Sequence, residues 1–162
     1  MVRVEVAHLG LDRSTNTPVV VLKEHSGDRM LRIFIGAPEA AAIALEMRGE
    51  SPPRPMTHDL LKHLLAAFGG ALRRVTITGL KDNTYFAVLL VYRGEQIFEI
   101  DARPSDGIAL ALRTDAPIFV SEDVLEGDSP EPGAVPSTES SADQLKKFLS
   151  KLDPQDLGRF QP

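Results

Sequence analysis

The sequence predicts an α+β protein in which helices pack against a largely antiparallel sheet. Two observations carry this prediction. Runs rich in β-branched and aromatic residues follow one another across short turn signals, which is typical of hairpins and meanders. Three stretches with helical apolar spacing lie between or after these runs.

The N-terminal part reads as a strand followed by a hairpin. Residues 2 to 9 alternate in polarity, and "PVVVLKE" and "RMLRIFIG" are two strand-like runs separated by "SGD" at residues 26 to 28. The fold therefore begins with an antiparallel sheet.

Two helices are predicted next. "APEAAAIALEMRG" has Pro38 at a first-turn position, Glu39 in the positive first turn and Gly49 just past the end. "ESPPRP" cannot continue that helix, because its prolines remove backbone donors. The second helix starts at Thr57, a suitable N-cap, and its apolar stripe predicts a core-facing side, formed by Leu60, Leu61, Leu64, Leu65 and Phe68.

The rest of the globular part reads as a three-stranded meander, a buried helix and a last short strand. The meander is "LRRVTITGL", "TYFAVLLVYRG" and "EQIFEIDA", with turn signals at residues 81 to 83 and 93 to 94. The helix from Pro104 to Arg113 is apolar nearly all round, which predicts burial, and "APIFV" supplies the last strand.

Composition divides the chain into three parts. Residues 1 to 126 are expected to form one domain, because 162 residues with 43% hydrophobic content support one core. Residues 127 to 140 are rich in Pro, Ser and acid, which predicts a disordered linker. Residues 141 to 162 predict an amphipathic helix and tail, which folds back on the domain or on a second subunit or, as the alternative, docks a protein partner through residues 141 to 152.

Charge and composition exclude several classes of protein. Residues 1 to 120 hold 14 basic and 14 acidic side chains, so they lack the basic excess that phosphate-driven nucleic-acid binding usually shows. No cysteine occurs, which excludes disulfides and thiolate chemistry. The sequence has no long uncharged apolar run and no secretory leader pattern, so a soluble cytoplasmic protein with no membrane contact is expected.

Two Arg-Pro segments place charged side chains at helix starts. In "RPMTHDLL", His58 and Asp59 open one helix, and a neutral imidazole is favoured at that positive end. In "IDARPSDG", Asp106 suits the first helical turn, whereas Asp101 has only a salt bridge to an arginine as its structural explanation.

If both segments line one cleft, metal-assisted phosphodiester hydrolysis becomes chemically feasible. Asp101, Asp106 and His58 would hold a divalent ion such as Mg²⁺, and these residues with Asp59 are the catalytic candidates. The phosphate-binding candidates, at the two helix starts, are Arg54, Thr57, Arg103 and Ser105. Each of these residues also has a structural interpretation as a cap or an ion pair, and the spacing is not specific to nucleases.

The segments "IGAPEAAAIALEMRGESPPRPMTHDLL" and "IDARPSDGIALALRTDAPIFV" resemble the bifunctional nuclease family of small bacterial proteins with plant relatives, and the tail resembles those of actinobacterial members. The resemblance covers roughly residues 1 to 126. It implies a mixed sheet, a homodimer, and DNase and RNase activity. Its motif positions fall on Glu39, Arg54, Pro55, Thr57, His58, Asp59, Asp101, Arg103, Pro104, Ser105 and Asp106, and Gly107 departs from the alanine or serine expected there.

The sequence therefore predicts a nuclease that hydrolyses DNA and RNA with a divalent metal ion. A non-catalytic regulatory protein with an anion-binding cleft and a partner-docking terminal helix is the first alternative, and the balanced charge of the folded part favours it. A structural dimerisation module, whose Arg-Pro segments serve only as salt-bridged caps, is the second.

Overall fold

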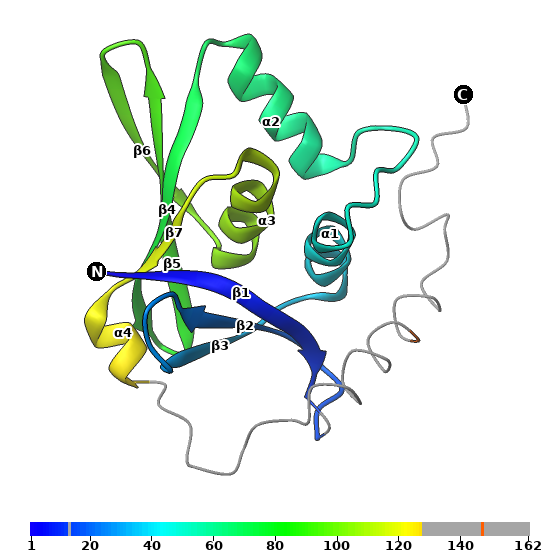
Figure 1. Ribbon diagram of the computed structural model, residues 1–162, viewed down its shortest axis with the longest axis vertical. Coiled ribbons are helices and arrows are strands. Elements are labelled where there is room, and N and C mark those ends of the chain that lie inside the picture. Colours follow the sequence, from blue (N-terminus) through cyan, green and yellow to red (C-terminus); the bar gives the residue numbers. More distant parts are fainter. Residues whose placement is uncertain (13, 128–146, 148–162) are drawn as a thin grey trace.

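Seven strands form one mixed sheet in the order β3-β2-β1-β7-β4-β5-β6. The structure, a computed structural model, describes residues 1–12, 14–127 and 147 (Figure 1). The elements are β1 (Val2–Leu11), β2 (Pro18–Glu24), β3 (Met30–Phe34), α1 (Ala37–Met47), α2 (Thr57–Ala67), β4 (Ala71–Lys81), β5 (Thr84–Arg93), β6 (Gln96–Ala102), α3 (Pro104–Thr114), β7 (Ile118–Val120) and α4 (Glu122–Gly127). The linker and terminal helix predicted over residues 127 to 162 lie outside the described residues, apart from Gly127 and Lys147.

The sheet consists of two antiparallel groups joined by a three-residue strand. β1, β2 and β3 form one group, and the meander β4–β5–β6 forms the other. β7 pairs antiparallel with β1 and parallel with β4, which makes the sheet mixed. The predicted α+β fold with a largely antiparallel sheet is therefore confirmed.

The predicted meander turns rest on specific backbone geometry. Asp82 and Asn83 have φ of 49° and 59°, and Gly94 has φ of 58°. Such left-handed conformations suit Asn, Asp and Gly, and they match the twist of a two-residue hairpin loop.

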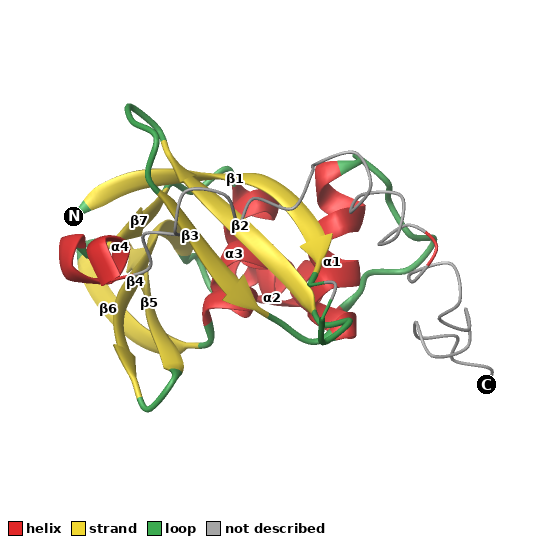
Figure 2. Ribbon diagram, turned by 90° about the horizontal axis from the view of Figure 1, so that it is seen from below, coloured by secondary structure: helices red, strands yellow, loops and turns green. Residues whose placement is uncertain are grey.

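The three long helices cover one side of the sheet, as Figures 1 and 2 show. α3 packs on β4 and β5 and also contacts α1 and α2. The side chains of Ile108, Ala109, Leu110 and Ala111 are at most 2% exposed, which confirms the predicted burial of this helix.

Gly107 lets α3 approach the sheet closely. A Cβ atom at this position would lie 2.8 Å from Cγ1 of Val75, a side chain on β4 that has no exposed surface. Alanine or serine would require Val75 to move within the close-packed core. The glycine at this position, where alanine or serine was expected, therefore has a packing explanation in this chain.

The orientation of α2 differs from the prediction. Leu65 is partly buried, but the other four residues of its apolar stripe are 40% to 72% exposed: Leu60, Leu61, Leu64 and Phe68. His58 is the one fully buried residue of this helix. Polar contacts at its first turn attach α2 to α3, and they direct the apolar stripe away from the core.

The start of α2 also differs in detail from the prediction. The helix begins at Thr57, so Met56 rather than Thr57 is the N-cap residue. The backbone N–H of Met56 donates to Oδ2 of Asp59 at 2.8 Å. Asp59 therefore satisfies a free backbone donor at this end, as a carboxylate in the third position of a helix does in a capping box.

Candidate functional site

The first turn of α3 holds an exposed ion pair. Nε of Arg103 donates to Oδ2 of Asp106 at 2.7 Å, and Nη2 donates to Oδ1 at 3.1 Å. The Arg103 side chain is 66% exposed and the Asp106 side chain 30%. Because Pro104 occupies the first helical position, Asp106 lies in the first turn, where the helix dipole stabilises a negative charge.

Two further helix starts meet this ion pair. Nε2 of His58, the second residue of α2, lies 3.1 Å from Oδ1 of Asp106. Nη1 of Arg103 lies 3.0 Å from Oε1 of Glu39, in the first turn of α1. The N-termini of all three long helices therefore converge, and the two Arg-Pro segments are in contact through His58 and Asp106, which was the condition for a shared site.

The second ring nitrogen of His58 has no hydrogen-bond partner within the described residues. The His58 ring makes one hydrogen bond there, through Nε2 to Asp106. A neutral His58 that donates from Nε2 to Asp106 presents a lone pair on Nδ1, which can accept a hydrogen bond from water or a ligand.

The environment of Asp106 favours its charged form. Burial alone would raise its pKa, but hydrogen bonds from Arg103 and His58 and the positive charge of Arg103 outweigh burial. The pKa of Asp106 therefore lies below its usual value. This carboxylate is ionised at neutral pH and can orient His58.

A second arginine-carboxylate pair joins the end of α3 to the first turn of α2, and its arginine is buried. Nε of Arg113, at the end of α3, donates to Oδ1 of Asp59 at 2.6 Å, and the Arg113 side chain is only 3% exposed. Its other nitrogens donate to the carbonyl oxygens of Ala109 at 2.9 Å and Ala42 at 3.1 Å. Arg113 thus ties α1, α2 and α3 together and fixes the start of α2, which carries His58.

Both carboxylate oxygens of Asp59 already accept hydrogen bonds within the protein. Burial acts to raise its pKa, but hydrogen bonds from the Met56 backbone and from Arg113 dominate, with smaller contributions from the charges of Arg113 and His63. The pKa of Asp59 is therefore lowered. With one oxygen on Met56 and the other on Arg113, Asp59 is placed to hold the helix rather than to contact a substrate.

The other predicted site residues are not part of this cluster. Asp101 lies on β6 next to Ile100, whose cross-strand partner Leu89 faces α3. Because successive strand residues point to opposite faces, Asp101 faces away from the helices. Arg54 and Thr57 are exposed and lie near His58 in sequence, and Ser105 is only 6% exposed.

The predicted metal ligands do not come together as a set of three. His58 and Asp106 are in contact, but Asp101 lies on the other face of the sheet. Within the residues that the structure describes, no three His, Asp or Glu side chains are grouped closely enough to hold a metal ion. The donor set therefore does not fit a protein-held divalent ion of the predicted composition.

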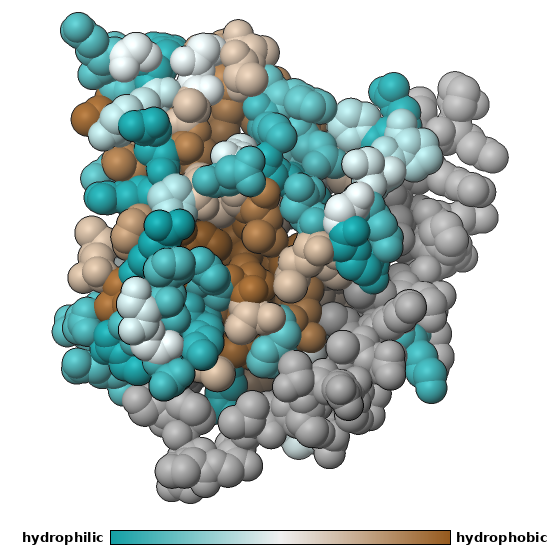
Figure 3. Space-filling model, in the orientation of Figure 1, coloured by the Kyte–Doolittle hydropathy of each residue, from teal (hydrophilic) through white to brown (hydrophobic). Residues whose placement is uncertain are grey.

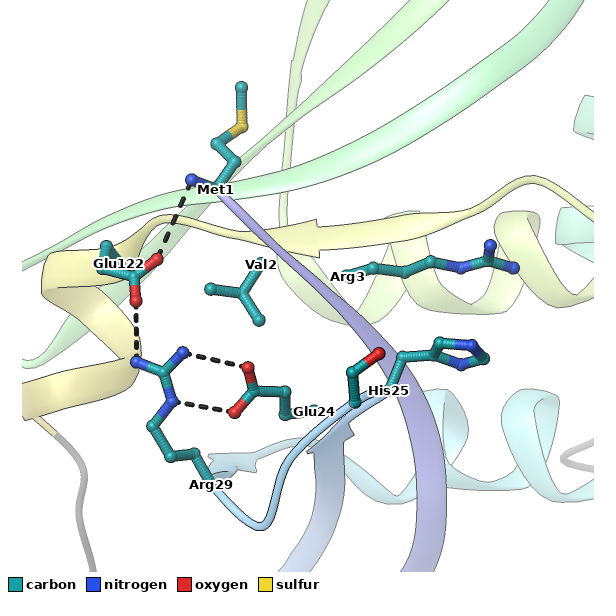
Figure 4. Close-up of a pocket in the computed structure, with 8 residues that line it drawn as sticks. Met1, Val2, Arg3, Glu24, His25, Arg29 and Glu122 are labelled. Carbon is teal, nitrogen blue, oxygen red and sulfur yellow. Dashed lines mark hydrogen bonds and ion pairs between the residues drawn. The ribbon is translucent and has the colours of Figure 1, made fainter.

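Two surface hollows lie away from the cluster. The first, of about 330 Å³, is lined mainly by the β1 start, the β2–β3 turn and α4, and Figure 4 shows its ion pairs. There Arg29 contacts both Glu24 and Glu122, and Glu122 also contacts the N-terminal amine. These charges neutralise one another, so the network fastens α4 to the N-terminal strands.

The second hollow, of about 320 Å³, lies between β1 and the end of α3. Figure 3 shows apolar side chains gathered in the middle of this face, over the same two elements. Its lining includes Val4, Val6, Leu112 and Ala116, with charged residues at its edges. Its charged lining residues are Arg3, Glu5 and Asp115, and Glu5 is already paired with His25, so we take the convergent helix starts as the candidate site.

Comparison with known proteins decides the family. The model of the bifunctional nuclease domain matches residues 20–132. The chain belongs to the bifunctional nuclease domain family. The matched range contains every member of the helix-start cluster, namely Glu39, His58, Arg103 and Asp106.

Relatives of this family differ in how much of the chain they share. An uncharacterised protein of Mycobacterium tuberculosis is 41% identical over 164 residues, covering 97% of this chain and 98% of its own length. Bifunctional nuclease 1 of Arabidopsis thaliana is 28% identical over 116 residues, and that of Oryza sativa subsp. japonica is 26% identical over 113. Each plant match covers 68% of this chain but only about a third of the plant protein, 35% and 34% respectively.

The sequence analysis did not identify Arg113 as a site residue. It identified Glu39 as one only through the family resemblance, and from its position alone as an acidic residue in a first helical turn. A signal for Arg113 was present. An arginine at the end of a helix predicted to be buried on all sides requires a partner, because an unpaired charge is costly in a core. Its partner Asp59, 54 positions earlier, could not be identified without the fold.

None of the helices in the described part of the chain combines the length and the hydropathy that crossing a membrane requires.

Proposed function

We propose that this chain hydrolyses phosphodiester bonds of DNA and RNA at the convergent starts of α1, α2 and α3. The observation that carries the proposal is the contact between His58 and Asp106, in which Nδ1 of His58 has no partner within the described residues. Membership of the bifunctional nuclease domain family and the plant relatives named bifunctional nuclease 1 support the same reaction class.

In this proposal His58 is the general base. Asp106 accepts the Nε2–H hydrogen bond, which fixes the tautomer and stabilises the imidazolium that forms. Nδ1 takes a proton from a water molecule as the water oxygen attacks phosphorus. The bond from phosphorus to the leaving oxygen then breaks, and the proton held by His58 passes to that oxygen.

Arg103 is the proposed phosphate-binding residue. Its guanidinium is the most exposed charged group of the cluster, and it already bridges Asp106 and Glu39. A guanidinium presents several donors to phosphate oxygens, and backbone N–H groups at helix starts add to the positive potential. Arg54, which is exposed beside α2, is proposed to contact a neighbouring phosphate of the same strand.

A divalent ion is proposed only as a cation that arrives with the nucleic acid. The His, Asp and Glu side chains of the described residues do not form a three-ligand metal site, so no step of the proposed reaction depends on a bound metal ion. If such a cation contributes, chelator will lower the rate in wild type and in Asp101→Asn alike. If Asp101 is a ligand, only the wild-type protein will respond to chelator.

The test compares cleavage of end-labelled single-stranded DNA and RNA by the full chain and by His58→Gln. We expect the variant to be slower by about 100-fold or more, because it removes the general base. The matched control is His25→Gln. His25 also pairs with a carboxylate, Glu5, at 2.6 Å, but it lies in the turn between β2 and β3.

The two histidine variants separate the outcomes. Loss of cleavage in His58→Gln with full activity in His25→Gln supports the proposal. Equal cleavage by all three proteins would assign the activity to a contaminant and remove the catalytic role of His58.

The alternative, a non-catalytic anion-binding protein, is favoured by the balanced charge of residues 1 to 120, which lack the basic excess typical of nucleic-acid binding. It predicts that inorganic phosphate shifts the amide resonances at the starts of α1, α2 and α3 while single-stranded nucleic acid stays intact. Titration of the wild-type protein with phosphate, followed by the cleavage assay on the same sample, distinguishes the two functions.

A further inference from the structure

Glu39 connects the first turn of α1 to the exposed guanidinium of Arg103. Oε1 of Glu39 lies 3.0 Å from Nη1 of Arg103, and the Glu39 side chain is 17% exposed whereas that of Arg103 is 66% exposed. The carboxylate is therefore held within the protein, while the guanidinium that it contacts faces solvent. A negative charge thus already lies on the group that is proposed to bind phosphate.

Gly36, the N-cap residue of α1, makes room for this carboxylate. A Cβ atom at Gly36 would overlap Oε2 of Glu39. The backbone of Gly36 is extended, with φ of −74°, so any residue could adopt its conformation. The absence of a side chain at this position therefore lets one oxygen of Glu39 lie against the start of α1 while the other reaches Arg103.

Asp106 and Glu39 bind different parts of the Arg103 guanidinium. Asp106 accepts hydrogen bonds from Nε and Nη2, which makes a bidentate pair. A second bidentate partner, such as two oxygens of a phosphate, has the edge formed by Nη1 and Nη2 left to it. Because Glu39 contacts Nη1, a phosphate on this edge must displace the Glu39 carboxylate or lie directly beside it, where like charges repel.

Glu39 is the weaker of the two partners of Arg103. The pKa of Arg103 is raised chiefly by the hydrogen bond and the charge of Asp106, and Glu39 contributes less. Glu39 also makes one contact where Asp106 makes two. An incoming phosphate is therefore expected to replace Glu39 and to leave Asp106 in place, together with its contact to His58.

The net charge of the cluster also opposes the binding of an anion. One guanidinium contacts two carboxylates, so with a neutral His58 the cluster is negative overall. A phosphodiester is itself an anion and is repelled by a neighbouring carboxylate. The full attraction between phosphate and Arg103 is therefore available only after Glu39 has moved away.

We propose that Glu39 competes with phosphate for Arg103 and thereby lowers the affinity of the site for nucleic acid. The inference rests on the proposed role of Arg103 as the phosphate-binding residue, and it adds an autoinhibitory contact to that site. The competing assignment is that Glu39 positions Arg103 for phosphate. The two assignments predict opposite signs, because loss of a competitor strengthens binding whereas loss of a positioning residue weakens it.

The test measures binding of labelled single-stranded DNA by fluorescence anisotropy at fixed salt. Every protein is the full chain and carries His58→Gln, so that cleavage is blocked. We expect the further change Glu39→Gln to lower the dissociation constant by about fivefold, which is the order of magnitude that one exposed ion pair supplies. Circular dichroism of each variant confirms that it is folded.

A double variant assigns the effect to Arg103. In the presence of Arg103→Gln, the change Glu39→Gln should alter the dissociation constant by less than about twofold, because the group for which Glu39 competes is absent. The matched control is Glu50→Gln, which removes a carboxylate that pairs with another exposed arginine, Arg48, at 3.0 Å. It should also alter DNA binding by less than about twofold, because salt screens the remaining long-range repulsion.

Titration with inorganic phosphate repeats the comparison without nucleic acid and with the native His58. Amide resonances at the starts of α1, α2 and α3 report the binding. Glu39→Gln should lower the dissociation constant for phosphate by a similar factor, about fivefold.

The possible outcomes separate this inference from the proposed function. Unchanged or weaker DNA binding in Glu39→Gln would overturn the competition, as would stronger DNA binding without stronger phosphate binding, and the phosphate site at Arg103 would stand in both cases. Equal strengthening with and without Arg103→Gln would also overturn it, because Glu39 would then act through general charge alone. DNA binding that Arg103→Gln leaves unchanged would remove the proposed phosphate site itself, and the inference with it.

Discussion

The two arginine-carboxylate pairs of α3 have the same chemistry and opposite surroundings. Arg113 and Asp59 meet at 2.6 Å with the arginine side chain 3% exposed, and Arg103 and Asp106 meet at 2.7 Å with the arginine 66% exposed. The buried guanidinium also donates to two main-chain oxygens, whereas the exposed one contacts a second carboxylate, Glu39.

Exposure decides what each pair contributes. A buried ion pair is difficult to break, because removing one partner leaves an uncompensated charge in a medium of low dielectric constant. An exposed pair contributes little to stability, and solvent or a ligand can replace either partner. The first pair is therefore expected to hold three helices in place, and the second to be available for a phosphate.

The largest expected effect is on stability, from Arg113→Met. Methionine fills a similar volume but leaves Oδ1 of Asp59 without its donor and removes a hydrogen bond from the carbonyl oxygens of Ala42 and Ala109. We expect the free energy of unfolding to fall by about 3–5 kcal/mol, measured by urea denaturation at neutral pH.

The matched control for this prediction is Arg48→Met. Arg48 pairs with Glu50 and is 41% exposed, so its loss should change the free energy of unfolding by less than about 1 kcal/mol. Equal losses in the two variants would remove the distinction between buried and exposed pairs.

The second largest expected effect is the loss of cleavage rate caused by Asp106→Asn. An asparagine amide can donate to Nε2 of His58 and so favour the wrong tautomer, which should slow cleavage by about 10²–10⁴-fold. Stability should change by less than about 1 kcal/mol, because the replacement keeps the shape and much of the hydrogen bonding.

Glu5→Gln provides the corresponding control, since Glu5 pairs with His25 away from the site. A large loss of stability without a loss of cleavage in Asp106→Asn would reverse the roles assigned to the two pairs.

Most of the fold was predictable because its determinants are local. Turn residues fixed the meander, and left-handed Asp82 and Asn83 occupy the turn where "KDN" predicted it. The unbroken apolar character of residues 108 to 112 predicted a buried helix. Short α4 and the three-residue β7 carry weaker local signals, and only a strand over residues 116 to 120 was predicted there.

The sequence predicted which segments form the candidate site, but not which of its carboxylates have a structural role and which contact His58. Acids and a histidine at two helix starts indicated convergence, and His58 and Asp106 do meet. The sequence could not separate Asp59 from Asp106, because the difference depends on which carboxylate faces Arg113. Nor could strand alternation alone show that Asp101 points away from the helices, since that requires the register of β6 on β5.

The exposed stripe of α2 shows most clearly why local patterns were insufficient. The spacing of its leucines is that of a core-facing helix, but Asp59 and His58 attach the helix by an adjacent side. Their partners Arg113 and Asp106 lie about 50 positions later in the chain. Long-range polar contacts therefore determined which side of α2 was buried.

The third effect is the response of stability to acid. The pKa of Asp59 is below its ordinary 3.8 when the chain is folded, so the unfolded chain binds a proton more readily. The contribution of Asp59 to the free energy of unfolding is therefore fully present above about pH 4. It is lost as the pH falls below the unfolded pKa of 3.8 toward the lower pKa of Asp59 in the folded chain.

Asp59→Asn should flatten the acid limb of a plot of unfolding free energy against pH. The same change at Asp82, an exposed turn residue, provides the control. An unchanged acid limb in Asp59→Asn would show that the pair with Arg113 is not what lowers this pKa.

The smallest expected effect on stability comes from Arg103→Gln, which should change the free energy of unfolding by less than about 0.5 kcal/mol. In a His58→Gln background, where cleavage is blocked, the same change should weaken binding of single-stranded DNA by about tenfold, as one charge-assisted phosphate contact is lost. Fluorescence anisotropy at fixed salt measures this binding, with Arg48→Gln in the same background as the control.

If Arg103→Gln instead destabilises the fold by about 2 kcal/mol or more and leaves binding unchanged, Arg103 is a structural residue like Arg113. The exposed pair would then be a helix cap, and the proposed phosphate site would lose its principal cation.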